Sequence, residues 1–207
     1  MTAFALRSRV SVMTAIPDFV DALRREQRAA RHTVSLVLGV HAIAVALLAV
    51  ANSHFEWRLG WWAALVPALV PAAVYVVLWL AVKIRQRLTG MGGGRDGFGV
   101  MAILALVFAL AFPFTFVAVL LAGPGTFLGL GLVVIGARLH ARPLWGPGLG
   151  LMAVSPLVAL GTIDNHAAFR GDQPGTLVLA VLSAALAALA GYAYRTERHA
   201  LRGSALL

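Results

Sequence analysis

The sequence predicts an all-α integral membrane protein, a bundle of six transmembrane helices. Of its 207 residues, 60% are hydrophobic and only 12% are charged, about half the charged share of a soluble domain. The apolar residues fall into runs close to the ~20 residues that cross a bilayer core as a helix. The charged residues gather between those runs. A soluble enzyme of this size could not cover so much apolar surface with polar side chains.

Cysteine content and net charge exclude further classes. The chain has no Cys, which excludes disulfide scaffolds, thiol catalysis and Cys-ligated metal sites. Its formal net charge is +9, which in a soluble chain would suggest nucleic acid. In a membrane chain, basic residues set the orientation instead, so we expect no nucleic-acid partner. The Arg-rich, Ala-rich and Gly-rich composition is typical of a bacterial protein from a GC-rich genome.

Six apolar runs are predicted to be transmembrane spans. The fourth is short and Gly-rich, and the turn Gly123-Pro124-Gly125 separates it from the third, because Pro lacks a backbone donor and Gly permits a tight reversal. The first span also serves as an uncleaved insertion signal, since no signal peptide precedes it. The predicted spans are 33–51, 61–82, 98–122, 125–140, 147–163 and 176–194.

The distribution of basic residues predicts the orientation. With six spans and the N-terminus inside, 15 of the 17 Lys and Arg residues fall on the cytoplasmic side and only Arg58 and Arg170 fall outside. Without the fourth span the split would be 11 to 6. The positive-inside rule therefore favours six spans in the cytoplasmic (inner) membrane, with both termini cytoplasmic. Three aromatic residues would then lie at the outer interface: Trp57, Trp61 and Trp62.

The chain divides into a basic segment at 1–32, the transmembrane domain at 33–194 and a cytoplasmic tail at 195–207. Residues 17–31 predict a short amphipathic helix lying on the inner leaflet. This segment either only fixes the topology or docks anionic lipid or a cytoplasmic partner. The basic residues predicted to form a docking surface are Arg24, Arg25, Arg28, Arg85, Arg87 and Arg95.

Polar groups and prolines within the spans are candidates for a substrate pathway. His41 is the one ionisable residue near the middle of a predicted span. Such a histidine is commonly a neutral side chain bonded to a neighbouring helix, and less often a ligand or proton carrier. Pro67 and Pro71 each remove a backbone hydrogen bond from the second span. Tyr75 lies one turn further along the same span.

Small residues recur at intervals of four in two spans, at Gly125 and Gly129 and at Ser183, Ala187 and Gly191. Such faces let helices approach closely. We expect them to serve packing within the bundle, or alternatively a homo-oligomer.

The predicted outer loops hold the remaining reactive groups. Glu56 and Asp164 would lie at similar depth and are candidates for a catalytic acid and base. His54 and His166 are weak candidates for metal ligands, because no diagnostic ligand spacing accompanies them. Ordinary loop polarity is the simpler interpretation of all four residues, and the sequence predicts neither a metal nor a cofactor.

Three functions remain open from the sequence. The first is a transport-type, permease-like membrane subunit that works with a separate partner such as an ATPase, because the chain has no soluble domain of its own. The second is a membrane-embedded enzyme acting on a lipid or isoprenoid, with Glu56 and Asp164 as acid and base. The third is a non-catalytic scaffold or immunity-type protein.

Overall fold

The computed structural model describes residues 32–54, 62–89, 97–111, 114–167, 169 and 173–204. Within these ranges the chain forms eight α-helices and no strand. The predicted interfacial helix at 17–31 lies outside the described residues. The helices are α2 (Thr33–His54), α3 (Trp62–Thr89), α4 (Phe98–Leu110), α5 (Phe116–Ala122), α6 (Pro124–Arg138), α7 (Arg142–Ala159), α8 (Thr162–His166) and α9 (Pro174–Ser204).

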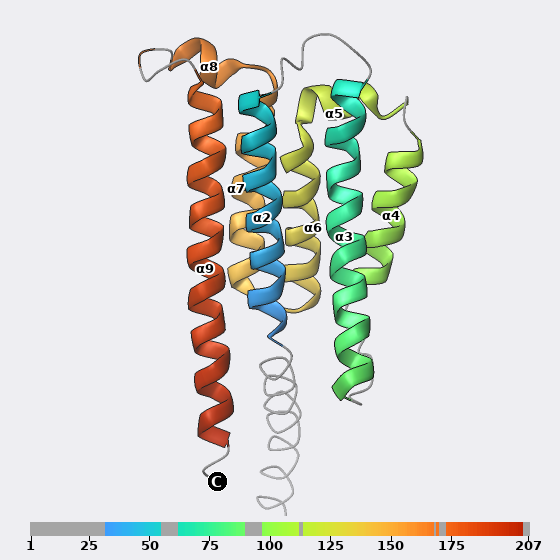
Figure 1. The fold of residues 1–207 in the computed structure, drawn as a ribbon, viewed down its shortest axis with the longest axis vertical. Coiled ribbons are helices and arrows are strands. Elements are labelled where there is room, and N and C mark those ends of the chain that lie inside the picture. The colour runs from blue at the N-terminus through green and yellow to red at the C-terminus, as the bar shows by residue number, and fades with distance from the viewer. Residues whose placement is uncertain are drawn as a thin grey trace, which may run out of the picture.

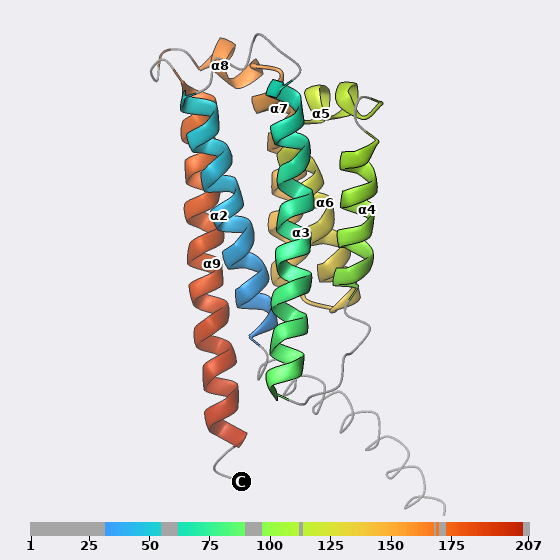
Figure 2. The same cartoon turned by 45° about the vertical axis from the view of Figure 1, so that its right-hand side comes forward.

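Six of these helices run side by side and alternate in direction along the chain, namely α2, α3, α4, α6, α7 and α9 (Figures 1 and 2). Short α5 and α8 lie across one end of the bundle. The start of α2 and the end of α9 lie together at the opposite end. The described chain therefore enters and leaves the bundle on the same side.

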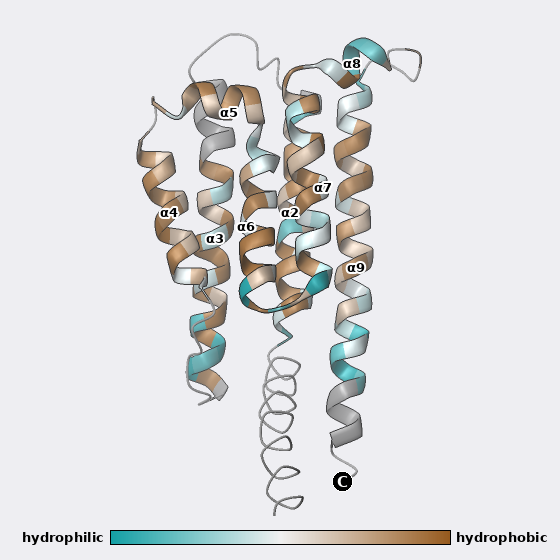
Figure 3. Ribbon diagram, turned by 180° about the vertical axis from the view of Figure 1, so that it is seen from behind, coloured by the Kyte–Doolittle hydropathy of each residue, from teal (hydrophilic) through white to brown (hydrophobic). Residues whose placement is uncertain are grey.

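Three helical segments are long and apolar enough to cross a membrane, within Thr33–Ser53, Leu69–Leu88 and Pro174–His199. A fourth crossing results if the bent pair of α5 and α6 counts as one span. The middle parts of the helices are apolar, whereas the far ends of α3 and α9 and the turn between α6 and α7 are hydrophilic (Figure 3). The bundle thus has the surface of a membrane protein. The sequence predicts six spans, whereas only three or four segments of the described chain are long and apolar enough to cross a membrane.

The prediction of one continuous span over 98–122 is wrong. Helix α4 ends at Leu110, and α5 begins only at Phe116. Pro113 lies in the interruption, outside the described residues, and a proline there removes a donor and clashes with the preceding turn. At 1.5 Å per residue, the 13 residues of α4 extend only about 20 Å, which is short of the ~30 Å bilayer core.

The predicted break at Gly123 is confirmed. Gly123 has φ 71° and ψ 157°, outside the helical region and readily reached only by glycine. The axes of α5 and α6 consequently differ by 86°. Helix α5 therefore lies across the end of the bundle, and α6 returns along it.

Other predicted spans shift at their ends. Helix α7 begins five residues before the predicted fifth span and ends at Ala159, with Pro147 and Pro156 inside it. Helix α3 continues through both Pro67 and Pro71 to Thr89. Helix α9 extends to Ser204, beyond the apolar run that predicted it.

Antiparallel α2 and α9 are joined by side-chain hydrogen bonds at three levels. At one end, Nδ2 of Asn52 donates to Oγ1 of Thr176 over 2.8 Å. Near the middle, Oγ of Ser183 donates to the carbonyl of Ala42 over 2.9 Å. At the far end, the side chain of Glu197 accepts from the first turn of α2. Polar contacts of this kind hold helices together where the surroundings are apolar.

Glycines set the spacing of α6 and α7. Gly129 and Gly148 face each other so closely that a Cβ on Gly148 would lie 2.7 Å from the carbonyl oxygen of Gly129. Gly125 is buried against Ser155 in the same way. The predicted packing role of Gly125 and Gly129 is therefore confirmed. On α9, Ser183 bonds to α2, but Ala187 and Gly191 are exposed.

Candidate functional site

The most deeply buried polar contact joins His41 of α2 to Tyr75 of α3. The His41 side chain is 0% exposed and that of Tyr75 is 1% exposed. Nδ1 of His41 donates to the carbonyl of Val37 over 2.8 Å, and Nε2 lies 3.5 Å from the Tyr75 hydroxyl. The prediction that His41 bonds to a neighbouring helix agrees with this arrangement, and the two predicted pathway side chains lie together.

The Tyr75 hydroxyl extends the contact to a third helix. It donates to the carbonyl of Leu128 on α6 over 2.9 Å and lies 3.2 Å from the carbonyl of Phe127. Gly131 makes this approach feasible, because a Cβ at that position would overlap the Tyr75 hydroxyl. Glycine at 131 is therefore required by the position of the tyrosine. The site is a buried polar junction of α2, α3 and α6.

The predicted prolines lie on the same helix as Tyr75. Pro71 is buried one turn before Tyr75, and the backbone remains helical at both prolines. The carbonyls that these prolines free belong to residues 63 and 67, about three and two turns before Tyr75, and the helix continues past both.

A second polar cluster, which the sequence analysis missed, lies where α2 begins. Glu197 of α9 is only 8% exposed. Its carboxylate accepts from the backbone N–H of Val34 over 3.0 Å and from Oγ of Ser35 over 2.6 Å. His32 lies 3.4 Å away through Nδ1, and its ring stacks 5.0 Å from that of Tyr194. A carboxylate placed on free N–H groups at a helix N-terminus is stabilising.

A signal for Glu197 was present in the sequence. The buried positions Leu179, Leu186, Ala193 and Glu197 of α9 follow one another at intervals of seven, seven and four residues, which places them on one face of the helix. Glu197 continues this stripe beyond the apolar run. The predicted span ends at Tyr194 because polar residues follow it, which places Glu197 in the predicted tail.

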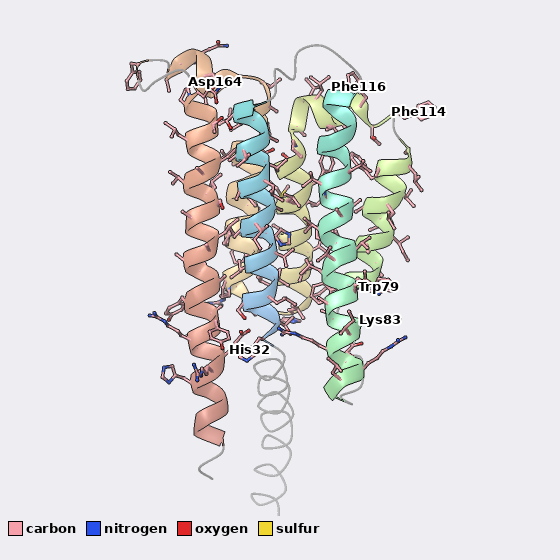
Figure 4. All side chains as sticks on the ribbon, in the orientation of Figure 1. His32, Trp79, Lys83, Phe114, Phe116 and Asp164 are labelled. Carbon is pink, nitrogen blue, oxygen red and sulfur yellow. The ribbon has the colours of Figure 1, made fainter. Side chains whose placement is uncertain are left out.

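Asp164 lies at the end of the bundle opposite the Glu197 cluster, and it has a hydrogen-bond partner there. Its Oδ1 accepts from the backbone N–H of Gly175 over 2.7 Å, and so caps the start of α9 (Figure 4). Its predicted catalytic partner Glu56 lies outside the described residues. The structure therefore gives Asp164 a capping role and brings no second carboxylate to it among the residues that it describes.

The weak metal-ligand candidates do not come together. Nδ1 of exposed His166 donates to the carbonyl of Thr162 in the same short helix. The side chain of His54 lies outside the described part. Across the described residues, no three His, Cys, Asp or Glu side chains gather as a metal site would require.

The basic residues of the described helices gather at the end where α2 begins. Lys83, Arg85 and Arg87 occupy the last turns of α3, Arg138 and Arg142 flank the turn from α6 to α7, and Arg195 and Arg198 lie near the end of α9. The side chains of Arg85 and Arg87 are exposed. The other predicted docking residues, Arg24, Arg25, Arg28 and Arg95, lie outside the described residues.

The sequence and structure were compared with known protein families, curated proteins and solved structures. None of the three comparisons finds a significant match. Functional inference therefore depends on the residues themselves: a buried junction at His41 and Tyr75, two carboxylate caps and one basic end.

Proposed function

We propose that this chain is a transport-type membrane subunit that works with a separate cytoplasmic partner. It would cross the cytoplasmic membrane with six segments and keep the basic end and both termini inside. The short α4 would be one of the six, accommodated by local thinning of the bilayer. The observation that carries the proposal is the His41–Tyr75 contact. It places a titratable side chain at the junction of three helices, among the mostly apolar buried side chains of the described chain. Intramembrane ionisable groups commonly mark substrate or ion pathways.

The partner would bind at the basic end. Exposed Arg87 lies in the last turn of α3, which extends further than the neighbouring α4 (Figure 1). Basic residues on the cytoplasmic side also follow the positive-inside rule. An ATPase is the partner we propose, because the described chain consists of helices with no nucleotide-binding βαβ unit.

Site-specific photocrosslinking tests this proposal in intact cells. A photoreactive residue at position 87 should link the full chain to one cytoplasmic ATPase subunit. The same residue at Leu177, exposed near the opposite end of α9, should link to lipid only. Reversing charge with Arg85→Glu and Arg87→Glu should abolish the protein crosslink. A chain that yields no ATPase crosslink from position 87 would not be the subunit proposed here.

A scaffold role is the second candidate, and one observation favours it. The polar side chains Asn52, Tyr75 and Ser183 all form contacts between helices, as expected of a bundle that serves only as a packed unit. Replacing His41 with Leu separates the two candidates. If the cellular phenotype of a deletion strain is fully restored by His41→Leu, the scaffold is favoured and the pathway is excluded.

A further inference from the structure

A group of three side chains at the basic end is independent of the junction described above. Lys83 and Trp79 belong to α3, and Arg138 ends α6. Nζ of Lys83 lies 5.1 Å from the centroid of the Trp79 ring, and both side chains lie toward the same end of the helix (Figure 4). This distance is typical of a cation–π contact. The tryptophan thus positions the lysine ammonium.

Two glycines bring Arg138 to the same place. A Cβ on Gly97 would lie 2.8 Å from Cδ of Arg138, and a Cβ on Gly99 would lie 3.2 Å from Nε1 of Trp79. Side chains from α6 and α3 therefore lie against two glycines that are only two residues apart. Because Trp79 also contacts Lys83, these contacts place Lys83 and Arg138 at the same end of the bundle, on either side of the first turn of α4.

These two cations have no carboxylate partner among the described side chains. The described carboxylates are Asp164, which caps α9 at the opposite end, and Glu197, which binds the first turn of α2. Lys83 and Arg138 are both exposed. Within the described part of the chain, the patch therefore offers two positive charges to an anion.

Apolar surface continues from the patch toward the middle of the bundle. Leu80, one turn before Lys83, is 44% exposed, and Val100, one turn after Gly97, is 50% exposed. A free phosphate would use only the cations. A phospholipid would place its headgroup on the cations and its acyl chains on this apolar surface.

We propose that Lys83 and Arg138, with Trp79, form a binding site for the headgroup of one anionic phospholipid. The lipid belongs to the leaflet at the basic end. Basic pockets between transmembrane helices bind anionic headgroups on the cytoplasmic side of other membrane proteins. Lys83 lies one turn before Arg87 on α3, so the site adjoins the proposed partner surface. The two assignments involve different side chains and different binding partners, so either can fail without the other.

Native mass spectrometry of the full-length chain in nonionic detergent tests the site. The chain is titrated with phosphatidylglycerol or with phosphatidylcholine of the same acyl chains. We expect tighter binding of phosphatidylglycerol, and a loss of about fivefold in its association constant for Lys83→Gln and for Arg138→Gln. Lys83→Arg retains the charge and should retain the binding, which separates charge from misfolding.

Arg198→Gln on α9 is the matched control, because it removes one exposed charge from the same end of the bundle. Its association constant should stay within about twofold of the parent chain, since Arg198 belongs to another helix and makes none of the contacts that define the site. Equal losses for Arg198→Gln and Arg138→Gln would overturn the site. Equal affinity for the two lipids would also overturn it. Displacement of phosphatidylglycerol by millimolar inorganic phosphate would assign the patch to free phosphate instead.

Discussion

Ser35 and Glu197 are 162 residues apart in the sequence, yet they form the shortest hydrogen bond between α2 and α9 in the described chain. Oγ of Ser35 donates to Oε2 of Glu197 over 2.6 Å. The same carboxylate accepts the N–H of Val34. A residue of the last helix thus provides the cap that the first turn of α2 lacks from its own sequence. Helix capping here is a long-range tertiary contact.

Replacing Glu197 with Ala should destabilise the bundle by about 1–3 kcal/mol, because buried donors lose a charged acceptor. Glu197→Gln keeps an oxygen acceptor and should lose less. The measurement is unfolding in mixed micelles followed by circular dichroism. Arg198→Ala, on the exposed neighbouring position, is the control. A double variant with Ser35→Ala should be less destabilised than the sum of the single changes, because both remove the same bond.

Gly131→Ala should also be destabilising, by about 1–3 kcal/mol, because the new methyl group overlaps the buried Tyr75 ring and a packed interior cannot expand freely. Gly150→Ala is the matched control. A Cβ on Gly150 meets nothing within 4 Å, so the higher helix propensity of Ala should leave stability unchanged or raise it. Similar unfolding curves for the two variants would disprove the close approach of α3 to α6.

Asp164→Asn separates the capping role from the catalytic one. Asn caps helices about as well as Asp, so stability and the cellular phenotype should both be retained. Asp164→Ala should lower stability by about 1 kcal/mol. If Asp164 is instead an acid or base, Asn should abolish the phenotype while the fold stays intact. Complementation of a deletion strain, read beside thermal unfolding, distinguishes these outcomes.

The absence of Cys makes the topology directly measurable. Single Cys residues at Ser53, Arg87, Arg142 and Asn165 can be labelled with a membrane-impermeant maleimide in whole cells. Six crossings with the basic end inside predict labelling at 53 and 165 only. The positions at 87 and 142 should react only after the membrane is opened. Labelling of 142 from outside would show that α6 and α7 do not return the chain as proposed.

The all-helical fold class and the apolar outer surface of the bundle could be predicted, because both depend on composition and on long apolar runs. The break at Gly123 was also predictable, since its cause is local: a glycine followed by a proline. The contact of His41 with another helix followed from its burial in an apolar run. In each case the physical cause lies within a few residues of the effect.

The remaining features depend on partners distant in the sequence. Asp164 resembled a loop carboxylate because the N–H that it caps belongs to Gly175, eleven residues away. Glu197 resembled a tail residue because Val34 and Ser35 lie at the other end of the chain. The break in the third predicted span is different, because its cause, Pro113, is local, and the span was drawn through it on hydropathy. Long-range pairing and backbone geometry decide these points.

The pairing of α2 with α9 has a consequence for synthesis. Chains emerge from the ribosome N-terminus first, so α2 is synthesised more than a hundred residues before the helix that bonds to it. Three hydrogen bonds between the two helices can form only after α9 has been synthesised: those of Asn52 with Thr176, Ala42 with Ser183 and Ser35 with Glu197. The local pair of α6 and α7, joined by a short turn, can form in the meantime. Translation of the final helix therefore completes the bundle, and a chain truncated before α9 would leave the first helix without its partner.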